Sequence, residues 1–146
     1  MNEPIRVLHV LGNLNLGGVE TRLMEIYREI DREKIQFDFV IHTNEHCYYN
    51  NEVLELGGNI YNLKRFNIFN YFSYKKEWKE FLKNHIDIDI IHSHMTTTAF
   101  VYLREAKRFT HIKKRVAHAR NSNKSSFLRK LMSRLSKYYA TELLAV

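Results

Sequence analysis

The feature that most constrains the fold is a regular alternation of strand-like and helix-like segments along the chain. The strand-like segments are short, apolar and rich in β-branched residues, whereas the helix-like segments repeat apolar residues every three or four positions. The strand-like segments are residues 5–11, 37–42, 59–63, 86–93, 113–119 and 142–146. The helix-like segments are residues 19–30, 51–56, 68–85, 97–108 and 125–139. This alternation, with short loops, predicts a doubly wound, Rossmann-like α/β domain with a parallel sheet covered by helices on both faces.

Two of these helices carry apolar residues that we expect to face the core. In the first helix these are Val19, Leu23, Ile26, Tyr27 and Ile30. In the helix within residues 68–85 they are Phe72, Trp78, Phe81 and Leu82. The spacing places each set on one side of its helix, so each helix should pack on the sheet through that side.

Length and composition favour one ordinary globular domain. The chain has 146 residues, 45% of them hydrophobic and 27% charged, and no apolar run approaches the ~20 residues that span a bilayer. Its start lacks the basic and apolar regions of a secretory signal, so we expect a cytoplasmic protein. No linker divides the chain, and its apolar end at residues 145–146 predicts a truncated chain that lacks a further domain.

Cys47 is the only cysteine, so the chain cannot form an internal disulfide. His42 and His46 lie nearby, but the segment lacks the three or four ligands at recognisable spacing that zinc sites use. We therefore interpret Cys47 as a loop or packing thiol and predict no metal site.

The net charge of +7 comes from the last third of the chain. Residues 1–103 carry 11 Lys and Arg against 14 Asp and Glu, whereas residues 104–146 carry 12 against 2. This asymmetry indicates an anionic partner, for which nucleic acid, an acidic membrane surface and a phosphate-bearing substrate all qualify.

A glycine-bearing loop, residues 12–18, joins the first strand to the first helix. It has the Gly12-x4-Gly17 spacing of a Walker A loop but continues with Gly18 and Val19 instead of Lys and Ser or Thr, and it also lacks the dinucleotide GxGxxG spacing. Free amides at a helix start can bind an anion, so Gly17 and Gly18 are candidate ligand-binding residues. A tight turn without a ligand is the alternative.

Histidines follow two later strands, at the edge where parallel α/β sheets bind ligands. His92 and His94 project on the same face of their strand, and His94 is nearer the ligand edge. His118 closes the next strand, beside the polar residue Asn121. Each histidine taken alone is equally well explained as a structural residue.

Four motifs together resemble the N-terminal domain of family 4 glycosyltransferases with the two-domain GT-B architecture, particularly bacterial polysaccharide-synthesis members. They are RVLHVLGNLNLGGVETRLMEIYREI, DIIHSHM, RVAHARN and YYATELLAV. The resemblance implies that Gly17 and Gly18 approach the diphosphate of a nucleotide-sugar donor and that His94 lies by the transferred sugar. It implies that His118 and Asn121 border the acceptor side of the cleft. It also implies a retaining reaction with no metal or other cofactor, a lipid-linked glycan acceptor, and a donor site largely in a second domain that is absent here.

The basic segment 125–139 has two interpretations. Its apolar stripe comprises Leu128, Leu131, Leu135 and Tyr138, and its basic residues are Arg129, Lys130, Arg134 and Lys137. The helix could rest on an anionic membrane surface, which would make the protein peripheral on the inner face of the cell membrane. The alternative is a core-facing helix with a solvated basic face.

The sequence therefore leaves three classes of function open. The first is the acceptor-side half of a glycosyltransferase, with no nucleic-acid partner. The second is another nucleotide-sugar enzyme of the same architecture, such as an epimerase. The third is a non-catalytic basic α/β module that binds nucleic acid, for which no recognition motif is present.

Overall fold

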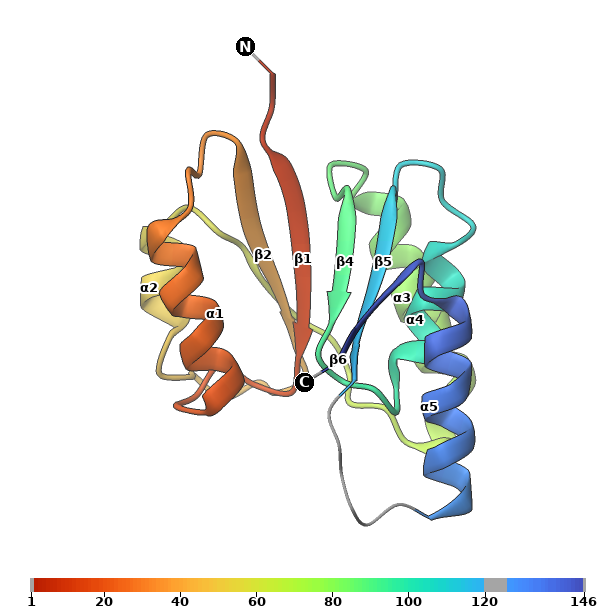
Figure 1. Ribbon diagram of the computed structural model, residues 1–146. Coiled ribbons are helices and arrows are strands. Elements are labelled where there is room, and N and C mark those ends of the chain that lie inside the picture. Colours follow the sequence, from red (N-terminus) through yellow and green to blue (C-terminus); the bar gives the residue numbers. More distant parts are fainter. Residues whose placement is uncertain (1, 120–125, 146) are drawn as a thin grey trace.

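The computed structural model follows the predicted alternation of strands and helices (Figure 1). It describes residues 2–119 and 126–145. The strands are β1 (Ile5–Leu11), β2 (Ile35–Ile41), β3 (Ile60–Asn62), β4 (Ile90–Ser93), β5 (Lys114–Ala119) and β6 (Glu142–Ala145). The helices are α1 (Gly18–Glu29), α2 (Asn50–Glu55), the 3-10 turn η1 (Ile68–Asn70), α3 (Tyr71–Asn84), α4 (Ala99–Ala106) and α5 (Phe127–Tyr139).

The described strands form one parallel sheet in the order β3-β2-β1-β4-β5-β6. The chain runs outward from β1 to β3 and then returns to place β4 on the other side of β1. Ligands of open parallel sheets bind at such a reversal, outside the carboxyl ends of the strands. The ends of β1 and β4 are therefore the first place to look for a site.

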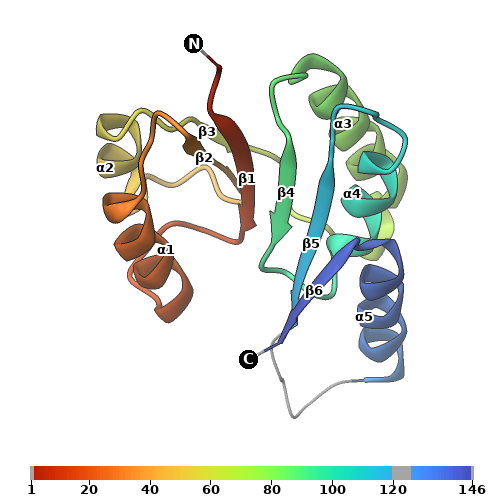
Figure 2. The same ribbon diagram turned by 45° about the horizontal axis from the view of Figure 1, so that its top comes forward.

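The helices cover the sheet unequally on its two faces (Figure 2). Helices α1 and α2 pack over β1 and β2 in one apolar cluster that includes Leu11, Tyr27 and Phe39. Helices α3 and α4 pack on the opposite face in a second cluster that includes Trp78 and Tyr102. Among the described residues, the first cluster contains no member of β4, β5 or β6. The α1 side of these three strands is therefore less covered than their other side.

Strand β4 is shorter than predicted, because residues 86–87 form a turn and residues 88–89 lie outside the strand. Asp89 explains the late start of the strand. Its carboxylate accepts a hydrogen bond from the backbone amide of Arg6 at 3.0 Å and one from Lys113 Nζ at 2.6 Å. The alternation of Ile and Asp before β4 resembles a strand in sequence, but Asp89 bonds to its neighbours from the segment that precedes the strand.

Two predicted core residues lie at the surface. Phe72 in α3 is 83% exposed. The inward face of this helix contains Tyr74, Trp78 and Phe81. At helical spacing, Phe72 lies on the side of the helix opposite Phe81. Ile26 in α1 is also exposed, at the edge of the buried face of that helix. The apolar residues of both helices thus extend beyond the stripe that contacts the sheet.

Candidate functional site

The loop after β1 is held against the segment that follows β2. Leu14 is fully buried, and its carbonyl accepts a hydrogen bond from the amide of Tyr49 at 3.0 Å. The carbonyl of Gly12 accepts one from the amide of His42 at 3.1 Å. These contacts fix the path of the chain into α1.

The glycine pair lies at the start of α1, as predicted. Gly17 is the N-cap residue in an extended conformation, and no side chain caps the helix there. A Cβ atom on Gly17 would clash with the carboxylate of Glu20, whereas a Cβ atom on Gly18 would meet no described heavy atom within 4 Å. Packing within the described chain therefore does not require glycine at position 18. The open space lies at the positive end of the helix, which suits an anionic group.

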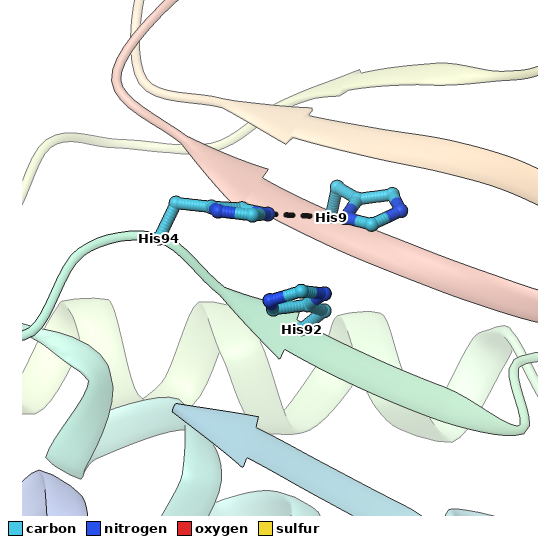
Figure 3. Close-up of side chains that lie close together, drawn as sticks. All are labelled: His9, His92 and His94. Carbon is cyan, nitrogen blue, oxygen red and sulfur yellow. Dashed lines mark hydrogen bonds between the residues drawn. The ribbon is translucent and has the colours of Figure 1, made fainter. Parts of the chain in front are cut away.

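Histidine rings lie side by side across β1, β4 and β5. The ring centroids of His92 lie 5.1 Å from His9, 4.2 Å from His94 and 5.7 Å from His118. His94 and His118 are 5.6 Å apart. The structure thus brings together the two predicted histidines and adds His9, which sequence reasoning did not select. Figure 3 shows the three rings contributed by β1 and the end of β4.

Strand pairing positions these rings. His9 lies opposite His92 in the β1–β4 ladder, and the amide of His94 extends that ladder by donating to the carbonyl of Val10 at 3.1 Å. Ser93 points to the other face, where its hydroxyl bonds to that of Tyr102. These bonds fix the backbone on both sides of His94. Nδ1 of His9 and Nε2 of His94 then lie 3.1 Å apart, at hydrogen-bond distance.

Burial keeps two members of the group uncharged. Burial, together with the neighbouring His94 and His92, lowers the pKa of His9 well below its usual value. Burial and the neighbouring His118 lower the pKa of His92 to about 4. At neutral pH these imidazoles are therefore neutral, and they can bind through nitrogen lone pairs and N–H groups rather than through charge.

A cleft runs along the same carboxyl edge, next to Met95. It consists of a hollow of about 270 Å³ beside Gly12 and a second hollow of about 440 Å³ beside Thr98. Both hollows share His42, Arg65 and Met95 as lining residues. Their common walls indicate one elongated site that reaches from the loop after β1 to the start of α5.

The cleft has one buried imidazole and two exposed guanidinium groups. Nε2 of His42 lies 3.4 Å from the hydroxyl of Tyr74, and burial lowers the pKa of His42 despite its hydrogen bond to the carbonyl of Leu63. Arg65 and Arg129 line the larger hollow and are exposed. Sequence reasoning considered His42 only in connection with Cys47 and did not select Arg65. The order of elements could have pointed to both residues, because His42 follows the last residue of β2 and Arg65 lies in the segment after β3.

Three residues of the apolar stripe of α5 are exposed and Leu135 is half-buried, so the core-facing interpretation does not hold for most of the stripe. Tyr138 is 74% exposed and Leu131 is 43% exposed, and Leu128 is exposed at the larger hollow. Phe127, which the predicted stripe omitted, is 82% exposed. The helix instead contacts the domain through its other side, where Ser136 is buried.

The four predicted basic residues of α5 divide between two surfaces. Arg129 lines the cleft. Lys130, Arg134 and Lys137 are exposed and share a side of the helix next to the outward apolar residues. Asn121, the remaining predicted site residue, lies outside the described residues.

One side-chain group in the described chain has the composition of a metal site. A ligand atom of His9, one of His92 and one of His94 all lie within 4.8 Å of one another. Among the described helices, none has the length and apolar character needed to cross a bilayer.

The chain matches the family described as Glycosyltransferase Family 4 over residues 16–145. It is 34% identical over 119 residues to EpsF of Bacillus subtilis (strain 168), which is named as a glycosyltransferase. That match covers 81% of this chain and 30% of EpsF. The chain therefore spans less than a third of the length of this curated relative.

Solved structures with the same fold carry different activities in their names. MurG of Acinetobacter baumannii superimposes on 98% of this chain with a TM-score of 0.63, at 14% identity and over 41% of its own chain. An O-GlcNAc transferase of Thermobaculum terrenum gives a TM-score of 0.54 over 79% of this chain and 20% of its own, also at 14% identity. A glucose dehydrogenase from Haloferax mediterranei gives 0.51 over 99% of this chain and 37% of its own, at 8% identity. These likenesses show the fold, and the sequence match carries the family.

Proposed function

We propose, from the premise that the chain belongs to glycosyltransferase family 4, that it is the acceptor-side domain of an enzyme that moves a sugar from a nucleotide-sugar donor to a lipid-linked glycan. The observation that carries this proposal is the carboxyl edge of the sheet. There an open helix start, neighbouring histidines and an arginine-lined cleft follow successive strands. A second domain, which supplies most of the donor site, completes the enzyme.

The start of α1 binds the donor diphosphate in this proposal. Gly18 leaves space for close approach of a phosphate to the backbone, and the positive end of the helix stabilises negative charge. Charge develops on the nucleoside diphosphate as it leaves the sugar. Fixed amide groups at this position would therefore stabilise the transition state more than the ground state.

His94 lies beside the transferred sugar. Its hydrogen bond with His9 holds one ring nitrogen and so fixes the orientation of the ring. A ring held in this way can hydrogen-bond to a sugar hydroxyl without first losing rotational freedom. In the proposed reaction the transferred sugar retains its anomeric configuration, and the transfer step needs no metal or other cofactor.

The cleft receives the acceptor, and we assign His118 and Asn121 to the acceptor side of the enzyme. Arg65 and Arg129 suit a phosphate-bearing acceptor because guanidinium groups bind phosphate oxygens with paired hydrogen bonds. Lipid-linked glycans present a diphosphate close to the membrane surface.

The outward side of α5 suits a location at the membrane surface, since exposed Phe127, Leu131 and Tyr138 adjoin basic residues. We place the enzyme in the cytoplasm, peripheral on the inner face of the membrane, in cell-surface polysaccharide synthesis.

The decisive experiment uses the full-length protein and a panel of nucleotide-sugars with a lipid-linked diphosphate acceptor. We expect transfer from one donor, with retention visible in the NMR spectrum of the product. Arg129→Gln should raise the KM for the acceptor about tenfold, which corresponds to roughly 1.4 kcal/mol, and leave the donor KM unchanged. Lys130→Gln, one position along the same helix and outside the cleft, is the matched control.

Two results would contradict the proposal. One is the absence of transfer from every nucleotide-sugar by an intact full-length protein. The other is turnover by the 146-residue chain alone at the rate of the full-length enzyme, because the donor site would then not require a second domain.

A further inference from the structure

We propose that His9, His92 and His94 form a binding site for a zinc-class divalent metal ion, Zn²⁺ or Co²⁺, that takes no part in the proposed sugar transfer but shares His94 with it. Three imidazoles without a carboxylate are a ligand set that suits Zn²⁺, Co²⁺, Ni²⁺ or Cu²⁺ and disfavours Mg²⁺ and Ca²⁺, which prefer oxygen ligands. Three protein ligands with a fourth position open to water are a recurring zinc arrangement.

The distances between the ring nitrogens fit this assignment. In a tetrahedral site with Zn–N bonds of about 2.0–2.1 Å, neighbouring ligand nitrogens are roughly 3.3 Å apart. Nδ1 of His9 and Nε2 of His94 already lie at 3.1 Å. One nitrogen of His92 lies within 4.8 Å of the other two ligand atoms. A small rotation of the His92 ring would bring it into the coordination sphere, and the metal would replace the hydrogen bond between the other two rings.

The backbone holds these ligands in place. His9 and His92 are register partners in the β1–β4 ladder, and His94 follows two residues later on the same face (Figure 3). His9 is only 2% exposed, and its ring packs edge-on against Phe37 with a centroid distance of 4.3 Å. Ligands on paired strands keep their spacing without the metal, so little ordering is needed when an ion binds.

One buried ring nitrogen, on His92, supports a ligand at this place. Nε2 of His9 and Nε2 of His92 have no hydrogen-bond partner among the described residues. An ion bound to Nδ1 of His9 would leave Nε2 of that ring unpaired, whereas rotation of the His92 ring could give its unpaired nitrogen a metal partner.

An ion can reach the group because the α1 side of β4 is only partly covered. His92 and His94 are half-buried, and no described residue of β4 belongs to the apolar cluster beneath α1 and α2. His118 lies on the open side, with its ring centroid 5.6 Å from that of His94. The fourth coordination position therefore faces either His118 or water.

Sequence spacing could not reveal this site. Eighty-five positions separate His9 from His94, and the His-x-His pair in DIIHSHM offers only two ligands on its own. The third ligand comes from the first strand through the parallel pairing of β1 with β4.

The test is titration of the tag-free, metal-free full-length protein with Co²⁺, followed by displacement with Zn²⁺. We expect one equivalent to bind with the visible absorption bands of tetrahedral Co²⁺. His9→Phe, which keeps a ring against Phe37, and His92→Gln should each weaken binding at least tenfold. His46→Gln, an exposed histidine away from the group, is the matched control and should bind as the unchanged protein does.

Several outcomes would overturn the assignment. They are the absence of stoichiometric binding, affinity that neither cluster variant changes, and a thiolate-to-cobalt charge-transfer band, which would point to Cys47. Circular dichroism must show that each variant is folded. If one variant is not, the X-ray absorption spectrum of the zinc-loaded unchanged protein decides, since it should show three or four nitrogen ligands at about 2.0–2.1 Å and no sulfur.

Discussion

Nδ1 of His9 and Nε2 of His94 lie 3.1 Å apart, although 85 positions separate the two residues along the sequence. The pairing of β1 with β4 brings them together. Through this contact a buried residue of the first strand fixes a ring at the ligand edge. In the proposed transfer reaction His9 would therefore be a positioning residue for His94, and in the proposed metal site it would be a ligand in its own right.

This double use of His94 predicts that zinc inhibits the full-length enzyme. A metal on Nε2 of His94 would replace the hydrogen bond with His9 that orients the ring and would place a positive charge beside the sugar, so micromolar Zn²⁺ should lower the transfer rate at least fivefold and a chelator should restore it. The measurement is the ratio of rates with and without Zn²⁺. His9→Phe should bring this ratio close to one, whatever its own basal rate. Equal inhibition of the variant and the unchanged enzyme would place the inhibitory metal elsewhere.

Gly18→Ala separates a folding role of the glycine pair from a binding role. A methyl group at position 18 meets no described heavy atom, and alanine stabilises a helix relative to glycine by about 0.5–1 kcal/mol, so thermal unfolding should be unchanged or slightly later. The same methyl would occupy the space assigned to the donor diphosphate. We expect a tenfold or larger rise in the donor KM of the full-length enzyme.

Gly58→Ala is the contrasting control for this experiment. A Cβ atom there would lie 2.6 Å from the carbonyl oxygen of Phe37 and 2.7 Å from the hydroxyl of Tyr27, so this variant should lower the unfolding temperature. An unchanged donor KM in a folded Gly18→Ala enzyme would remove the diphosphate from the start of α1.

The outward side of α5 predicts salt-sensitive binding to anionic vesicles. Phe127 and Tyr138 supply exposed apolar surface, and each nearby basic residue contributes about 1 kcal/mol at an anionic membrane. Co-sedimentation with phosphatidylglycerol vesicles should decrease with added salt and with Lys130→Glu combined with Arg134→Glu. Exchanging Lys79 and Lys83 of α3 for Glu changes the net charge equally and should have little effect. Equal binding to neutral vesicles, or none to either, would show that another partner covers this side.

The general fold was predictable from the sequence because strand and helix periodicities are local. Residues two or four positions apart determine each pattern, and the alternation of patterns determines the class of sheet. The non-strand segment at residues 86–89, which begins with a turn at 86–87, escaped this reasoning because Ile-Asp repeats have the period of a strand. What ends the strand pattern there is the bonding of Asp89 to Arg6 and Lys113, which are distant in sequence.

The candidate site was only partly predictable, for a related reason. His94 directly follows β4, His118 lies near the end of β5 and the glycine pair ends the loop after β1, so their position at the ligand edge can be read from the order of elements. His9 lies inside the apolar run IRVLHVL and looks like a core residue until the neighbour of β1 is known. The apolar stripe of α5 was ambiguous in the sequence. An amphipathic pattern shows that a helix has an apolar and a polar side, but it does not show which side packs against the domain.

Asp89 predicts a pH dependence of folding that is separate from the site. Burial would raise the pKa of its carboxyl group, but hydrogen bonds from Lys113 and from the amide of Arg6 lower the pKa below its usual value. A folded-state pKa below the unfolded one contributes stability that is fully present above the unfolded pKa and is lost as the pH falls through the folded one. Asp89→Asn should therefore cost about 1–2 kcal/mol at pH 7, a modest value because Lys113 is largely exposed.

Urea unfolding between about pH 7 and pH 2 measures this cost. The difference in unfolding free energy between the unchanged chain and Asp89→Asn should shrink from about pH 5 downward. Glu3→Gln, which removes a carboxylate from the exposed N-terminal segment, controls for the change in net charge. A difference that stays constant over the whole range would mean that the shape of the side chain, and not its charge, stabilises the start of β4.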